Sequence, residues 1–506
     1  MWNRIAGGKD LQSCSLGLLP RVVRPFPVVH VLGPVIVLLG LSMLLPLAVA
    51  HLFADAARIA YDESAAFTMV VGGLLWWATR RYRSELRINH GYLLVALTWT
   101  VLPAFATLPL LLAIPGMSFT DAYFETASAM TTTGATVIVG LDALPASINV
   151  WRAMLQWLGG MGVVVLAVAI LPLLGVGGRQ MFKAETPGPM KEEKLSPRIA
   201  ETAKGLWAVY FALTLLCLLA YRWAGMSWLD ALVHSFTTMP LGGYSTHDAS
   251  FAYFDSAAIE FVAVVFMLVA GVNFGTHFLA FRGRSLAPYR RDPEVLAFFV
   301  VLLLSCWGVA AYLRLTGAYP DLGTAARYAT FNVISIATTT GYASTDYSRW
   351  PLFAPLWMLV LCVFASCSGS TGGGIKMIRA QLMWRNSLRL FTTLIHPHAQ
   401  TVVKLRGRSI PNNVVFGMLA FMVMFGSTTL LAMLLLTATG LDFLSAATAA
   451  VACVTNTGPG LGVVGPAGNY ASLTDLQKWV LTATMLLGRL ELFTLIIVFT
   501  PAFWRR

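Results

Sequence analysis

Long apolar runs separated by short polar segments define the pattern of the whole chain. The runs are Val31–Ala50, Ala65–Trp77, Tyr92–Ile114, Val163–Val176, Leu206–Leu219, Phe261–Gly275, Leu296–Leu313, Leu352–Phe364, Val414–Leu436 and Val480–Val498. With mildly polar flanks they reach about 20 residues, the helix length that crosses a hydrocarbon core of about 30 Å. The pattern predicts an all-α polytopic membrane protein with 10 spanning segments.

Four copies of a shorter unit lie between these spans. Each copy is a short amphipathic helix followed by a turn rich in threonine and glycine. The helices open at Asp121, Asp230, Tyr328 and Ser445, and a glycine follows each opening by 13 residues, at Gly134, Gly243, Gly341 and Gly458. The common offset predicts four pseudo-symmetric repeats, each a spanning helix, a short helix, a turn and a second spanning helix.

The four short helices and their turns are predicted to be re-entrant. A helix of about 12 residues does not cross a bilayer, and the unpaired backbone of a turn is unstable in lipid unless it is buried or lines a wet cavity. Four such segments fit around a central pore. Glycine allows backbone conformations that aim carbonyl oxygens at one axis, and carbonyls can replace the hydration shell of a dehydrated cation.

Composition and charge support this interpretation and exclude nucleic-acid binding. The chain is 57% hydrophobic and only 11% charged, with a formal net charge of +12. When polar segments are assigned alternately to two sides, one side holds 27 of the 35 Lys and Arg residues but 8 of the 23 acidic ones. This asymmetry follows the positive-inside rule and makes the basic side, with both termini, cytoplasmic. The acidic outer side would concentrate cations.

With these features in view, the chain resembles the TrkH/TrkG proteins of the Trk/Ktr/HKT superfamily of potassium transporters. Besides the four turns, the resemblance rests on Gly159-Gly160-Met161-Gly162, on the run from Ser368 to Lys376, on Asn456–Gly462 and on Gly488-Arg489. It covers nearly the whole chain, and the motifs in this order are highly specific. The two extra N-terminal spans look like the Trk branch.

The resemblance implies a function and partners. It implies potassium uptake across the bacterial inner membrane by a homodimer, surrounded by membrane lipid. It also implies a cytosolic regulatory partner of the TrkA type, whose RCK domains bind NAD(H) or ATP/ADP. The ion is potassium, and no nucleotide is expected on this chain. The expected divisions are 1–90, an N-terminal segment and helical hairpin; 91–176, repeat one; 177–204, a cytoplasmic linker; 205–282, repeat two; 283–391, repeat three; and 392–506, a linker and repeat four.

The four turns would form the selectivity filter, mainly through backbone carbonyls. The expected filter residues are Thr132, Thr133, Gly134, Leu241, Gly242, Gly243, Thr339, Thr340, Gly341, Asn456, Thr457 and Gly458. The second turn departs from the family pattern, since Met239, Pro240 and Leu241 stand where Ser and Thr are common. Pro240 lacks an amide donor and Leu241 lacks a bracing hydroxyl, which puts the rigidity of that quadrant in question. Counting from Asp230 favours Gly243 over Gly242 as the filter glycine.

A second candidate site is a glycine-rich gate within the second helix of repeat three. Ser368–Gly374 contains Gly369, Gly372, Gly373 and Gly374 and should interrupt a helix. A phosphate loop is a poor alternative because Ile375 separates Gly374 from Lys376; a close-packing glycine patch is another. The resemblance favours a mobile intramembrane loop, 368–376, below the filter.

Two cations accompany this gate. Arg489 lies within the last apolar run, where a charge is costly and by default marks a pathway or a paired site. It is expected to be an electrostatic barrier in the pore near the gate; the alternative is that its side chain snorkels to the interface or pairs with a buried carbonyl. Lys376 belongs to the gate or is merely juxtamembrane.

Three other functions are alternatives to potassium uptake. A sodium-permeable member of the superfamily usually has serine at the first filter glycine, so Gly134 argues against it. A secondary carrier for an organic solute would need polar side chains converging at mid-membrane. A membrane enzyme would need catalytic groups, and the sequence offers no HExxH motif, Ser-His-Asp set or Cys/His cluster.

Overall fold

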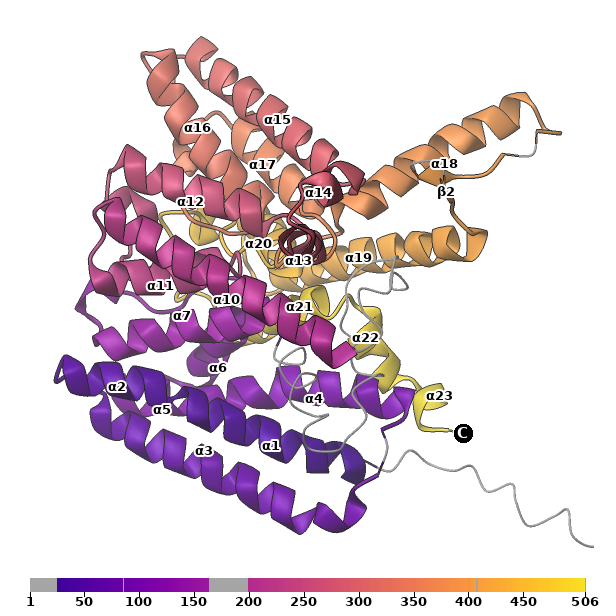
Figure 1. Ribbon diagram of the computed structural model, residues 1–506. Helices are drawn as coiled ribbons and strands as arrows, with labels where there is room; N and C mark the ends of the chain where they lie inside the picture. Colours follow the sequence, from indigo (N-terminus) through magenta and orange to yellow (C-terminus); the bar gives the residue numbers. More distant parts are fainter. Residues whose placement is uncertain (1–24, 85, 163–198, 400, 406–407, 506) are drawn as a thin grey trace, which may run out of the picture.

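The computed structural model describes residues 25–84, 86–162, 199–399, 401–405 and 408–505. The linker 177–204 therefore lies mostly outside the described residues, as do the run Val163–Val176 and residues 1–24. The described residues are mainly helical. They also contain one antiparallel pair of two-residue strands, β1 (Lys404–Leu405) and β2 (Arg408–Ser409). Figure 1 shows α1, α2 and α3 along one side of the molecule, whereas α18 and α19 project from another.

The helices follow the predicted order of repeats. The N-terminal hairpin is α1 (Phe26–Ser42), α2 (Leu44–Leu52) and α3 (Arg58–Ala78). Repeat one is α4 (Ile88–Ala106), α5 (Leu108–Ala113), α6 (Phe119–Met130) and α7 (Ala146–Gly160), and repeat two is α10 (Ile199–Trp223), α11 (Trp228–Thr238), α12 (Ala257–Ala270) and α13 (Phe274–Gly283). Repeat three is α15 (Val295–Leu315), α16 (Leu322–Ala337), α17 (Phe353–Phe364) and α18 (Met377–Ile395), and repeat four is α19 (Asn412–Ala438), α20 (Phe443–Val454), α21 (Asp475–Arg489) and α22 (Phe493–Ile496). Short α14 (Ala287–Arg291) and α23 (Pro501–Trp504) complete the α-helices of the described residues.

Several spans are bent or broken, as the glycine-rich sequence suggests. Five described helical stretches are long and apolar enough to cross a membrane, and up to seven if each bent pair counts as one span. The bent pairs are α12 with α13, at 90°, and α21 with the segment Phe493–Phe499, at 107°. Of the other expected spans, Ala65–Trp77 and Leu352–Phe364 correspond to α3 and α17, and Val163–Val176 lies outside the described residues.

An N-terminal cap sets the start of each short helix. The side chains of Ser118, Ser227, Asp321 and Asp442 accept hydrogen bonds from the backbone N–H three residues later. Such caps satisfy an otherwise unpaired amide. Because the third cap is Asp321, α16 has 16 residues and begins six positions before Tyr328, earlier than the sequence pattern indicates.

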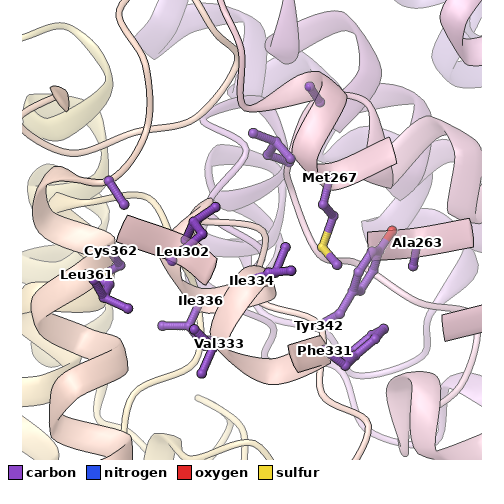
Figure 2. Close-up of a cluster of buried hydrophobic side chains, with 14 of the residues drawn as sticks. Ala263, Met267, Leu302, Phe331, Val333, Ile334, Ile336, Tyr342, Leu361 and Cys362 are labelled. Atoms are coloured by element: carbon purple, nitrogen blue, oxygen red, sulfur yellow. The ribbon is translucent and has the colours of Figure 1, made fainter. Parts of the chain in front are cut away.

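Apolar packing holds the short helices in place. Figure 2 shows Phe331, Val333, Ile334 and Ile336 of α16 among side chains of α12, α15 and α17. Tyr342, just after the third filter glycine, is fully buried in the same cluster. Its hydroxyl lies 2.5 Å from the Thr237 hydroxyl of α11, so the cluster also ties the third turn to repeat two.

Candidate functional site

The four predicted filter glycines meet in a closed ring. A Cβ atom built on each would collide with a backbone carbonyl of the next repeat. The collisions are Gly134 with Gly242 O at 2.1 Å, Gly243 with Thr340 O at 2.0 Å, Gly341 with Thr457 O at 2.2 Å and Gly458 with Thr133 O at 2.5 Å. The order runs from repeat one through four and back to one, so each glycine makes room for its neighbour's carbonyl.

Backbone conformation gives the register of each turn. The four ring glycines have φ between +78° and +91°, a region that L-residues rarely adopt. Two positions earlier, a non-glycine residue is also left-handed, namely Thr132, Leu241, Thr339 and Asn456, with φ of 55–62°. In the second turn this register makes Gly243 the equivalent of Gly134, which agrees with the 13-residue count. Leu241 adopts the same conformation as its counterparts despite the neighbouring proline.

The ring opens into a cavity. All four ring glycines line this cavity, together with residues of the loops that follow the turns, including Thr136, Tyr244 and His247. No group of three or more His, Cys, Asp and Glu side chains suited to a metal ion occurs among the described residues. At the ring itself, the atoms nearest to the four glycines are backbone carbonyl oxygens.

An ion-pair cluster joins repeats one and two beside this cavity. His247 Nδ1 hydrogen-bonds Asp142, its Nε2 lies 3.4 Å from an Asp230 oxygen, and its ring stacks on Tyr253. Burial opposes the charged form of His247, but the bonds to Asp230 and Asp142 outweigh burial and raise its pKa. The His247 bond in turn lowers the pKa of Asp142.

The glycine-rich loop between α17 and α18 lies directly below three of the turns. Thr371 Oγ1 donates to Met239 O at 2.9 Å, and Gly373 N donates to Thr339 Oγ1 at 2.9 Å. A Cβ atom on Gly373 would lie 1.9 Å from Thr455 O, and one on Gly372 would lie 3.0 Å from Thr338 O. The loop thus touches repeats two, three and four at the base of the ring, and the small residues allow that approach.

Arg489 joins this loop to the first turn. Its guanidinium donates to Thr371 O at 2.9 Å, to Thr132 Oγ1 at 3.0 Å, and to Gly159 O and Gly160 O at 2.7 and 3.2 Å. The cation is thus held by buried oxygens beneath the ring. Lys376 is buried, and its Nζ donates to Gly372 O, so it belongs to the loop and is not a juxtamembrane surface group.

Comparison with known proteins identifies the family. The TrkH family of cation transport proteins matches residues 61–506. The chain belongs to the TrkH family. It is 45% identical to the Trk system potassium uptake protein TrkH of Salmonella typhimurium, over 94% of this chain and 99% of that protein, and 34% identical to TrkG of Escherichia coli, over 94% and 98%. The crystal structure of the potassium transporter TrkH from Vibrio parahaemolyticus superposes with a TM-score of 0.87 at 42% identity, covering 96% of this chain and all of that one.

Membership of the TrkH family confirms several predictions. The chain is an all-α, multi-pass membrane protein, and it is a transport protein rather than an enzyme. The expected resemblance to TrkH and TrkG is confirmed. The residue divisions, the ion ligands and the gate stay predictions.

Sequence reasoning missed a buried ion pair behind the first turn. Glu125 of α6 and Arg152 of α7 lie 2.8 Å apart with side chains 0% and 2% exposed. Glu125 also accepts from Thr136 Oγ1 and Val137 N, while Arg152 donates to Ser245 O of the second turn and lies over the Tyr244 ring. Two charges at apolar helix positions were the available signal.

A second missed residue is Glu294, at the start of α15. One carboxylate oxygen, Oε1, accepts from Ser368 N at 2.8 Å and from Ile378 N at 2.9 Å. These amides lie at opposite ends of the glycine-rich loop. Glu294 therefore fastens both ends of the loop to the start of α15, the first helix of the same repeat. In the sequence, Glu294 ends a connecting segment rich in arginine, and nothing there distinguishes it from an ordinary surface charge.

Proposed function

We propose that this chain takes up potassium ions through the ring of four turns. The observation that carries the proposal is the cyclic fit of each glycine against the carbonyl that precedes the next repeat's glycine. Backbone carbonyls in such a ring can replace the hydration shell of a potassium ion. The names of the relatives, Trk system potassium uptake proteins, support the choice of ion.

The short helices contribute to cation binding in this proposal. α6, α11, α16 and α20 each end within a few residues of their ring glycine, so their carboxyl-terminal ends converge on the ring. A helix end of this kind carries a partial negative charge. Four of them favour a cation below the ring without placing a carboxylate there, which suits an ion that must leave again.

The loop containing Gly369, Gly372, Gly373 and Gly374 is the proposed gate. Its contacts with the bases of three turns, and the bond from Arg489 to the fourth, support a closed path beneath the ring. Glycine-rich backbone has many accessible conformations. A partner's binding energy of a few kcal/mol is then enough to shift the population toward an open loop.

The wider setting belongs to the same proposal. The chain acts as a homodimer in the bacterial inner membrane, with both termini cytoplasmic, and a cytosolic partner of RCK type that binds NAD(H) or ATP/ADP controls the loop. The relatives' names, which describe a Trk system, support the need for such a partner. A cysteine at Ser196, in a background without the six native cysteines, should resist an impermeant thiol reagent outside intact cells; ready labelling would invert the topology.

Ion flux in liposomes tests the central claim. Purified protein is reconstituted, and isotope or fluorescence flux is measured for potassium and for sodium, with and without a membrane potential. Potassium flux that clearly exceeds sodium flux supports the proposal. Equal fluxes would point to a sodium-permeable member of the superfamily, and the absence of either flux, with transport of an organic solute instead, would refute ion uptake.

A further inference from the structure

Three of the four turns share a side-chain brace that the second turn lacks. In the first, third and fourth turns, the threonine before the ring glycine hydrogen-bonds the threonine two positions earlier. The hydroxyl pairs are Thr131–Thr133 at 2.7 Å, Thr338–Thr340 at 2.8 Å and Thr455–Thr457 at 2.8 Å. The corresponding residues of the second turn are Pro240 and Gly242, which have no hydroxyl.

Gln156 of α7 occupies the place of the missing brace. Its side chain is fully buried. Nε2 donates to Gly242 O at 2.6 Å, and Oε1 accepts from Tyr244 N at 3.3 Å. Only this orientation of the carboxamide satisfies both contacts, because the reverse would place oxygen against oxygen and N–H against N–H.

The fit between Gln156 and Gly242 is reciprocal. A Cβ atom on Gly242 would lie 2.5 Å from the Gln156 carboxamide carbon and oxygen. Gly242 is not among the left-handed glycines, so its backbone would accept a side chain if the space were free. The glutamine thus fills the volume that a threonine side chain would need at position 242. A side chain at position 242 and a glutamine at position 156 therefore do not fit together.

The carbonyl that Gln156 holds belongs to the ring. Gly242 O is one of the four carbonyls that face a ring glycine. In the described part of the chain, it is the one of these four carbonyls that accepts a hydrogen bond from a side chain. We propose that Gln156 is a positioning residue that fixes the Gly242 carbonyl and so sets the ion selectivity of the second quadrant. This inference rests on the proposed function, since it assumes that the ring discriminates between ions.

Two single variants remove the brace in different ways. Gln156→Leu deletes both hydrogen bonds, and Gln156→Glu keeps the shape but loses the N–H donor. In liposomes, Gln156→Glu should lower the ratio of potassium to sodium flux by about fivefold, the factor that corresponds to one lost neutral hydrogen bond, and Gln156→Leu, which loses two, should lower it further. Gln477→Leu is the matched control. Gln477 is also a buried glutamine that accepts from one backbone amide and donates to another segment, but it contacts Thr439 and Thr474, away from the ring. The Gln477→Leu variant should leave the ratio of potassium to sodium flux unchanged.

A compensating variant separates positioning from simple packing. Gly242→Thr alone should collide with Gln156 and lower the ratio. Combined with Gln156→Ala and Pro240→Thr, the same change rebuilds the threonine brace of the other turns and should restore most of the selectivity. Residues that share one space are expected to show such coupling.

The outcomes are distinguishable from a failure of the proposed function. If the unaltered protein does not prefer potassium, the ring proposal fails first. If it does, and folded Gln156→Leu and Gln156→Glu keep its flux ratio, Gln156 does not set selectivity and the inference is overturned. A folded compensating variant that stays unselective would overturn it too. If none of the Gln156 variants folds, the residue serves folding and the inference is equally refuted.

Discussion

Replacing Gly134 with serine tests whether the first turn forms part of the ion path. The change has two physical consequences. The backbone at this position has φ of +80°, and a left-handed conformation costs an L-residue about 1–2 kcal/mol. The new Cβ would also lie 2.1 Å from Gly242 O, so the carbonyl must retreat by about 1.3 Å to reach an ordinary contact of 3.4 Å.

The steric part of this energetic cost comes from displacing a carbonyl of the ring. Overpacking of a well-packed site typically costs about 1–3 kcal/mol. If that energy is lost from potassium coordination, the potassium-to-sodium flux ratio falls roughly 5- to 150-fold, at about 1.4 kcal/mol for each factor of ten. The backbone part affects folding more than selectivity, because it is present whether or not an ion is bound.

Gly140 provides the matched control. It has φ of +77°, and a Cβ atom there would meet nothing within 4 Å. Gly140→Ser therefore carries the same backbone strain without moving a ring carbonyl. Fluxes of both ions are measured for the two variants in liposomes, per mass of folded protein. A Gly134→Ser protein that folds and keeps the ratio of the Gly140→Ser protein would refute the role of the first turn.

Three further predictions concern the proposed gate and the His247 cluster. Glu294→Ala should release both ends of the glycine-rich loop and raise potassium flux without changing the ion ratio, whereas Glu294→Gln, which keeps an acceptor oxygen, should change flux less; equal flux in both would argue against the clamp. Arg489→Ala should also raise flux at constant selectivity, and a well-folded variant with unchanged or lower flux would rule out the barrier. The raised pKa of His247 means that its ion pairs stabilise the fold below its unfolded pKa of 6.5 and are lost as the pH rises through the higher folded value. The midpoint of thermal unfolding should therefore fall as the pH rises above 6.5, and Asp142→Asn should flatten that slope; identical slopes would contradict the assignment.

Local patterns of the sequence were enough to place the four turns. Spacing alone selected Gly243 over Gly242, because the same short helix leads to each ring glycine. The third helix shows the limit of this reasoning. Its extra length comes from the cap at Asp321, and a Tyr-Ala opening within a longer helix gives no sign of where that helix begins.

Contacts between distant segments were beyond the sequence. Gln156 and Gly242 are 86 positions apart, and nothing in either segment shows that one fills the space of the other. The sequence placed the missing hydroxyl of the second turn at Leu241, whereas the bracing hydroxyls of the other turns belong to the positions of Pro240 and Gly242. The structure shows a backbone like that of the other turns, with the brace supplied from α7. A single sequence reveals a missing group more readily than the residue that replaces it.

The geometry also links Arg489 and Glu294, which both contact the proposed gate. Among the described residues, the glycine-rich loop hydrogen-bonds or closely approaches the turns of repeats two, three and four directly, but reaches the first turn by hydrogen bonds through Arg489. Movement of the loop away from the ring must therefore break the bond from Arg489 to Thr371 O, and it must also release the clamp at Glu294. If both groups stabilise one closed state, their contributions to its free energy add. The Glu294→Ala/Arg489→Ala double variant should then raise potassium flux above either single variant, up to the product of the two single effects while the open state is still rare. Flux per folded protein decides the matter, and a double variant no higher than the better single variant, where flux can still rise, would show that the two residues do not each stabilise the closed state.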